Sequence, residues 1–258
     1  SASAPVIESM VAAAILTAAY FASPGAARGW RVDRARLAPM LKAAGPIGLS
    51  GFLVIAIMQS DKLMLGGLVG PDPVGAYAAA VMLSMAWYMV PVIIGGSAAP
   101  ALTSLHDSDH AIYLKRLREV LAVVSGLGVI VALGGVLLAK PIVLLLFGAP
   151  FSDAAPVLMV HIWTGVFVGH VSIRTRALLI EGSSGVVMLL SAGTLAGNLA
   201  LNWLLIPPHG AMGAALATLG AWASAALLLP LLFASTRRFP AFMLQSLNPI
   251  GWFRVLAR

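Results

Sequence analysis

Long apolar stretches without charged residues dominate this chain. Between Glu181 and Arg237, 55 consecutive residues contain no Asp, Glu, Lys or Arg, and only the turn Pro207-Pro208-His209-Gly210 interrupts the apolar character. About 20 apolar residues are enough for a helix to cross the hydrocarbon of a bilayer. The pattern therefore predicts two membrane-spanning helices joined by a tight hairpin.

The same pattern recurs upstream of this hairpin. It predicts seven helices in all, at about residues 5–21, 43–69, 74–104, 119–147, 154–180, 186–206 and 211–233. The runs are continuously apolar and do not alternate with polar residues, which favours helices over the strands of a β-barrel. A helix also satisfies its own backbone hydrogen bonds where no water is present. We therefore predict an all-α, polytopic transmembrane helix bundle of about seven spans.

Composition and charge agree with a membrane protein. Hydrophobic residues make up 60% of the chain and charged residues 10%, whereas a soluble domain has about 25% charged residues. Twelve of the 16 lysines and arginines lie within residues 23–42, 105–119 and 237–258, and the alternate connections hold none. Because cytoplasmic loops are enriched in Lys and Arg, these segments and the C-terminus are expected on the cytoplasmic side. The net charge of +7 then reflects topology and membrane lipids as partners, and we expect no nucleic acid partner.

The order of these segments predicts a domain organisation. Residues 1–22 are expected to be the last transmembrane helix of a preceding lobe, 23–42 a basic cytoplasmic linker, 43–234 a six-helix transmembrane lobe, and 235–258 a cytoplasmic tail. The sequence has no signal peptide before its first helix, so we expect the chain to be a fragment. Apolar residues interleave with arginines in the linker, which fits either an amphipathic helix on the inner leaflet or a solvated loop.

Several short motifs resemble a known family. They are Ser60-Asp61-Lys62-Leu63-Met64-Leu65-Gly66 followed by residues 74–80, and Asn198-Leu199-Ala200-Leu201-Asn202-Trp203-Leu204-Leu205-Ile206-Pro207 followed by residues 210–218. In order and spacing they resemble the second half of bacterial O-antigen and exopolysaccharide flippases. These flippases belong to the multidrug, oligosaccharidyl-lipid and polysaccharide exporter superfamily, and the resemblance covers about residues 11–233.

The resemblance implies a function and a partner. It implies a transporter, not an enzyme, that moves an undecaprenyl-diphosphate-linked oligosaccharide across the bacterial inner membrane by alternating access. It also implies a missing N-terminal lobe of six helices. A cation-coupled multidrug exporter of the same superfamily is the alternative, and it would favour an acidic and aromatic cavity. A membrane-embedded glycan transferase would need an acid/base constellation on a sizeable loop, and the predicted outer loops are only a few residues long.

A carrier of a lipid diphosphate needs cations that are reachable from the membrane interior. Arg174 is the main candidate for a substrate contact, because it lies inside the fifth predicted helix on the same face as His170 and Glu181. On this hypothesis Glu181 holds or releases Arg174 and is also a possible coupling residue. Arg176 and His170 are further candidates for substrate contacts. Alternatively, Arg174 and Arg176 extend to the inner headgroups while Arg174 pairs with Glu181.

Polar residues inside the other spans are further candidates. Asp61 and Lys62 point roughly 100° apart on one helix, so at least one of them faces the bundle interior. Lys62 is a candidate substrate cation. Asp61 is expected either to bind a coupling Na⁺ or proton or to form an interhelical hydrogen bond. Asn198 and Asn202 are spaced to contact either substrate hydroxyls or a neighbouring helix.

No metal or organic cofactor is expected beyond a coupling ion. The chain has no cysteine, which excludes disulfides and thiolate metal sites. His161 and His170 are nine residues apart, which is not a chelating spacing on one helix. A neutral His170 that hydrogen-bonds across helices is expected, with proton coupling as the alternative.

Overall fold

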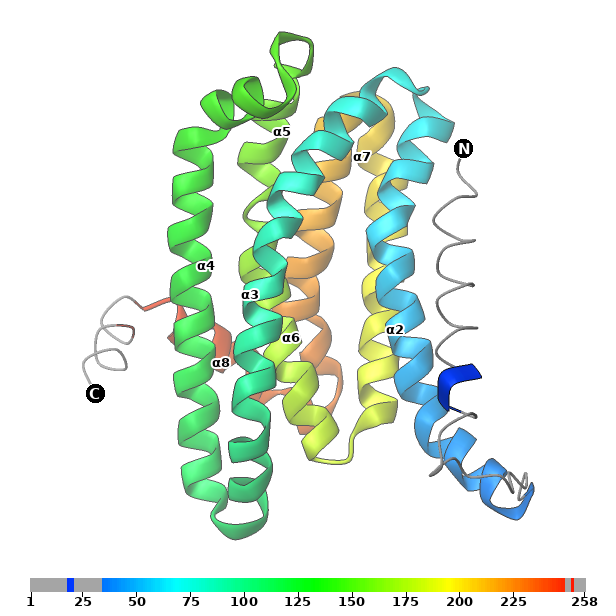
Figure 1. The fold of residues 1–258 in the computed structure, drawn as a ribbon, viewed down its shortest axis with the longest axis vertical. Coiled ribbons are helices and arrows are strands. Elements are labelled where there is room, and N and C mark those ends of the chain that lie inside the picture. Colours follow the sequence, from blue (N-terminus) through cyan, green and yellow to red (C-terminus); the bar gives the residue numbers. More distant parts are fainter. Residues whose placement is uncertain (1–17, 21–33, 249–251, 253–258) are drawn as a thin grey trace. The chain divides into compact units, whose positions relative to one another are not determined.

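The computed structural model describes residues 18–20, 34–248 and 252 (Figure 1). The chain divides into two compact units, residues 1–42 and 43–258, and the second unit carries the features discussed below. The predicted first helix and the first half of the predicted linker lie almost wholly outside the described residues. From Arg34 onward the predicted linker is helical, because α2 begins there.

All regular elements of the described residues are helices. The longer ones are α2 (Arg34–Leu68), α3 (Asp72–Ser108), α4 (His110–Phe147), α5 (Ala154–His161), α6 (Thr164–Ile180), α7 (Ser184–Leu227) and α8 (Arg238–Ser246). Short 3₁₀ turns lie at Ala149–Phe151 (η1), Leu229–Leu232 (η2) and Ala234–Thr236 (η3). Five segments of the described residues are long and apolar enough to cross a membrane. The structure thus confirms an all-α polytopic membrane bundle.

The predicted hairpin lies within α7. At Gly210 the backbone has φ 53° and ψ −130°, so α7 consists of two arms, residues 184–209 and 211–227, that run beside each other in opposite directions (Figure 1, yellow and orange). The arms approach closely just below the turn. A Cβ atom at Gly213 would lie 2.0 Å from the carbonyl oxygen of Leu205, so only glycine fits at this position.

Two predicted helix boundaries differ from the structure. The fourth helix begins at His110 and not near residue 119, because the Asp109 side chain caps it by accepting hydrogen bonds from the backbone N–H groups of Ala111 and Ile112, both at 3.0 Å. The predicted helix 154–180 is interrupted between α5 and α6, where the N–H of Gly165 donates a hydrogen bond to the carbonyl of Ile162, only three residues earlier. Such i to i+3 bonds tighten the chain locally and break the regular helix.

The predicted cytoplasmic tail also contains a helix. In α8, Phe239, Phe242 and Met243 are buried, and the helix packs against α4 and α7. The hydroxyl groups of Ser246 and Ser125 lie 2.7 Å apart and join α8 to α4 by a hydrogen bond. The first part of the tail is therefore an integral part of the bundle.

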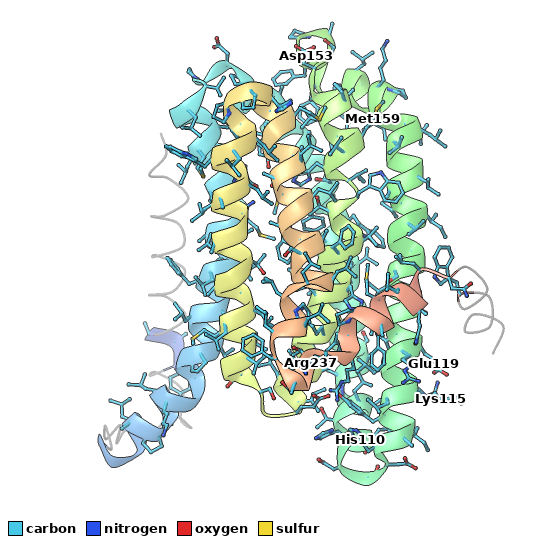
Figure 2. All side chains as sticks on the ribbon, turned by 180° about the vertical axis from the view of Figure 1, so that it is seen from behind. His110, Lys115, Glu119, Asp153, Met159 and Arg237 are labelled. Atoms are coloured by element: carbon cyan, nitrogen blue, oxygen red, sulfur yellow. The ribbon has the colours of Figure 1, made fainter. Side chains whose placement is uncertain are left out.

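The outer surface of the bundle is apolar. Leu63, Leu137 and Leu145 are 75%, 79% and 84% exposed, as expected of side chains that face lipid. Soluble proteins rarely expose contiguous apolar patches of this kind. The polar groups separate by end: His110, Lys115, Glu119 and Arg237 lie toward one end and Asp153 toward the other (Figure 2).

Candidate functional site

A buried carboxylate, that of Asp61, lies at the centre of a hydrogen-bond network between α2, α3 and α7. Asp61 is 3% exposed. Four donors reach its two oxygens: Tyr77 Oη at 2.9 Å, Asn198 Nδ2 at 3.0 Å, Asn202 Nδ2 at 2.7 Å and Thr218 Oγ1 at 2.7 Å. We call these five residues the Asp61 cluster.

The fold brings these residues together from three helices. Asn198 and Asn202 lie one turn apart on the first arm of α7, and Thr218 lies on the second arm. The close approach of the arms at Gly213 allows both arms to reach the same carboxylate. Ser60 supports the arrangement because its hydroxyl donates to Asn198 Oδ1 at 2.7 Å.

Within the part of the chain that the structure describes, the hydrogen-bond partners of the Asp61 carboxylate are neutral. Among the described residues, the ion pairs are those of Arg116 with Glu119 and of Arg238 with Glu181. The neighbouring Lys62 is directed elsewhere, since its amino group donates to Gln59 at 3.3 Å. A charge in a low-dielectric interior is costly unless it is paired. Four hydrogen bonds offset part of this cost, and a bound cation would offset much of the rest.

A small cavity adjoins the carboxylate. Its volume is about 20 Å³, and its lining includes Asp61, Tyr88, His161 and Trp222. This is room for one water-sized particle. Asn202 does not line the cavity, but its side chain donates to Asp61 and its Oδ1 atom is buried without a hydrogen-bond partner in the described structure. Carboxylate, amide and hydroxyl oxygens are the donors that hard cations prefer, so the residues present fit a small monovalent cation or a proton.

Arg174 is also buried, but its surroundings differ. It is 2% exposed, and its Nη1 donates to the backbone carbonyl of Ala225 near the end of α7. A positive charge at this place is favourable, because the last carbonyls of a helix carry partial negative charge. His170, one turn earlier on α6, is fully buried as well. In this conformation Arg174 therefore contacts a helix end and does not line an open cavity.

Glu181 has partners other than Arg174. It forms an ion pair with Arg238 of α8 and accepts a hydrogen bond from the hydroxyl of Tyr113 at 2.7 Å. The alternative ion pair of Arg174 with Glu181 is therefore not formed. Arg176 is half-buried and donates through Nη2 to the carbonyl of Val92 on α3 at 3.1 Å.

The structure thus brings together three of the predicted site residues, Asp61, Asn198 and Asn202, and keeps the candidate cations apart from them. Tyr77 and Thr218 belong to the same cluster, and sequence reasoning missed both. A usable signal was present, because a polar residue inside an otherwise apolar span usually faces another helix. Nothing in the sequence, however, indicates that these two residues share Asp61 as their acceptor.

Comparisons with known proteins indicate the family of this chain. The profile of a family described as polysaccharide biosynthesis protein matches residues 1–156. The probable flippase AglR of Haloferax volcanii is 27% identical over 164 residues, which cover 62% of this chain and 34% of that protein. The chain thus spans about a third of the length of this curated relative. No solved structure matches the chain.

Proposed function

Since this chain belongs to the polysaccharide biosynthesis protein family, we propose that it forms one lobe of a transporter that moves a lipid-linked oligosaccharide across a membrane. The flippase-type relative and the bundle of long apolar helices support this proposal. Transport rather than catalysis also fits the relative, because a flippase is a transporter and not an enzyme.

The finer parts of the proposal concern the substrate and the mechanism. The substrate is an undecaprenyl-diphosphate-linked oligosaccharide for O-antigen or exopolysaccharide synthesis, and the membrane is the bacterial inner membrane with the C-terminus in the cytoplasm. The lobe of residues 43–234 rocks against an N-terminal lobe of six helices, to which residues 1–22 contribute the last helix and 23–42 the linker. Alternating access of this kind is the usual mechanism of transporters built from two such lobes.

Asp61 couples transport to a cation in this proposal. The observation that carries it is the buried carboxylate with four neutral donors and no ion pair to any described residue. Because Asp61 lies on α2 and its donors come from α3 and both arms of α7, an ion bound at Asp61 changes how firmly these helices hold together. An ion that binds one conformation more tightly than the other shifts the population toward it.

The size of the cavity favours an ion over a drug. Asp61, Tyr88 and Trp222 give the cavity the acidic and aromatic character that a multidrug exporter would need. Its volume of about 20 Å³ is far below the ~300–1,000 Å³ of pockets for drug-sized ligands. We therefore assign this cavity to the coupling Na⁺ or proton.

The remaining candidates divide between substrate contacts and support of the bundle. Lys62 and Arg176 are half-buried and can reach an anionic ligand with little rearrangement. Arg174 and His170 are buried in this conformation, and they contact the diphosphate only if α6 and the end of α7 separate. Asn198 and Asn202 act through Asp61 rather than through sugar hydroxyls, and Glu181 acts by holding α8.

Complementation tests the proposal. The gene that encodes this chain, with all the sequence that accompanies it in the natural protein, is expressed in a strain that lacks its own flippase. Asp61→Asn is compared with Asp72→Asn, a matched change at an exposed carboxylate. We expect wild type and Asp72→Asn to restore surface polysaccharide, and Asp61→Asn to lose it while lipid-linked precursor accumulates. Normal export by Asp61→Asn would contradict the coupling role of Asp61. Failure of wild type to restore export would contradict the proposed substrate.

A further inference from the structure

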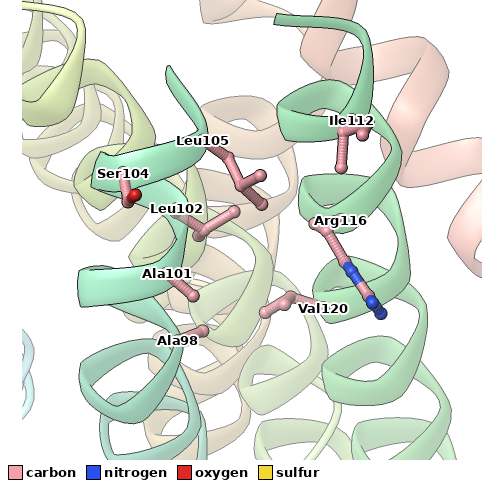
Figure 3. Close-up of a pocket in the computed structure, with 8 residues that line it drawn as sticks. All are labelled: Ala98, Ala101, Leu102, Ser104, Leu105, Ile112, Arg116 and Val120. Carbon is pink, nitrogen blue, oxygen red and sulfur yellow. The ribbon is translucent and has the colours of Figure 1, made fainter. Parts of the chain in front are cut away.

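A groove lies between the C-terminal end of α3 and the N-terminal end of α4, away from the Asp61 cluster. Its volume is about 540 Å³, and Figure 3 shows the residues that line it. They are Ala98, Ala101, Leu102, Ser104 and Leu105 of α3 and Ile112, Arg116 and Val120 of α4. Six of these eight residues are apolar, so the groove suits an apolar ligand.

Side-chain size explains why the groove exists. Ala98 and Ala101 present only methyl groups toward α4, while the larger side chains of Leu102 and Leu105 pack beside them (Figure 3). Helices whose facing residues are small either approach closely or leave a gap. Here the leucines keep α3 and α4 apart, and the alanines leave space open between them.

The charge at the mouth of the groove indicates what the ligand carries. A second hollow of about 380 Å³ is lined by Ile112, Lys115, Arg116 and Glu119, so it shares Ile112 and Arg116 with the groove. Arg116 is 64% exposed and contacts Glu119 through Nη1 at 2.9 Å. Two cations against one carboxylate leave a net positive charge beside an apolar slot, which is the complement of an anionic amphiphile.

We propose that this groove binds an anionic phospholipid, with one acyl chain between α3 and α4 and the phosphate at Lys115 and Arg116. The groove lies at the depth of a lipid headgroup region, because along α4 the charged side chains end at Glu119 and apolar ones begin at Val120. Basic residues close to a bilayer attract anionic headgroups. The groove runs from Ala98 to Leu105, about 10 Å at 1.5 Å per residue, which suits part of an acyl chain and is short for the polyprenyl chain of a glycan carrier.

Native mass spectrometry of the full-length protein in detergent tests the site. Dioleoyl phosphatidylglycerol and dioleoyl phosphatidylcholine are titrated separately, so that the headgroup is the only difference. The double change Lys115→Gln with Arg116→Gln removes the cations, and Ala101→Leu fills the groove. Lys140→Gln, at the other end of α4, and Ala86→Leu, at an exposed position of α3, are the matched controls.

We expect wild type to bind phosphatidylglycerol about tenfold more tightly than phosphatidylcholine, and the double glutamine change to abolish this preference. We expect Ala101→Leu to weaken binding of both lipids several-fold and both controls to bind as wild type. Equal binding of the two lipids by wild type would overturn the proposal, and so would unchanged binding in Ala101→Leu. A full-length protein that binds neither lipid here would show that another part of the protein covers the groove, which also overturns it.

Discussion

Two substitutions of Asp61 distinguish the contribution of the Asp61 cluster to stability from its contribution to function. Asp61→Asn keeps the size of the side chain and an oxygen that accepts from Asn198 and Asn202. The new amide nitrogen can donate to Tyr77 or Thr218, since a hydroxyl group can reverse its role. Asp61→Ala instead removes the shared acceptor of four hydrogen bonds.

The structure sets the size of both effects. Interhelical hydrogen bonds in membranes contribute ~0.6 kcal/mol each on average, so the loss of four amounts to about 2.4 kcal/mol. Donors that stay buried and unpaired raise the cost to about 3 kcal/mol for Asp61→Ala. Asp61→Asn should change the free energy of unfolding by less than about 1 kcal/mol, because its hydrogen bonds persist and the buried charge is removed.

The ion dependence distinguishes a coupling site from a purely structural cluster. Thermal unfolding of the purified full-length protein is measured in NaCl and in choline chloride at equal ionic strength. If Na⁺ is the coupling ion, the wild type gains about 2.7 kcal/mol at a concentration one hundred times its Kd, and Asp61→Asn gains nothing. An equal sodium effect in wild type and Asp61→Asn would refute binding at this carboxylate. Wild-type transport by Asp61→Asn would refute a coupling role for either ion.

Three further substitutions test the packing around the site. Gly213→Ala should lower the free energy of unfolding by about 3 kcal/mol or more, because the new Cβ atom meets backbone atoms that cannot move aside. Thermal unfolding is compared with that of Gly197→Ala, where a Cβ atom has open space. Similar unfolding of the two variants would contradict the prediction. Arg174→Met should change the free energy of unfolding by less than about 1 kcal/mol, since removal of a buried cation that has no ion pair among the described residues recovers its desolvation cost. A loss above about 2 kcal/mol in the same assay would show that the helix end needs the guanidinium. Glu181→Gln removes the ion pair with Arg238 and should increase hydrogen exchange in α8, and unchanged exchange there would show that apolar packing alone holds the helix.

Local patterns were enough to predict the membrane spans. Transfer of an apolar side chain into lipid is favourable whatever the other helices are. An apolar run such as residues 182–236 therefore indicates its membrane spans without knowledge of the helices that pack against them. The hairpin at Gly210 and the concentration of basic residues toward one end follow from equally local signals. Helix ends were less predictable, because the Asp109 cap and the interruption between α5 and α6 depend on one or two backbone hydrogen bonds.

The candidate site was only partly predictable. Asp61, Asn198 and Asn202 were predicted because they are polar residues in apolar spans, whereas the same signal was overlooked at Tyr77 and Thr218. The predicted pairing of Glu181 with Arg174 was an alternative drawn from spacing on one helix. The structure gives Glu181 partners on two other helices instead, because Arg174 lies seven residues, about 10 Å, away along the helix axis, whereas Tyr113 and Arg238 approach Glu181 from neighbouring helices.

By itself, the sequence determined that this protein is a bundle of membrane helices with a hairpin at Gly210 and a basic end. Only the tertiary structure decided which polar residues meet, and it placed around Asp61 donors that are 16 to 157 positions away in the chain. It also decided that α8 joins the bundle and that Arg174 is enclosed. The physical reason is that hydrophobic burial is a property of single segments, whereas a hydrogen bond between helices depends on the rotation and register of both.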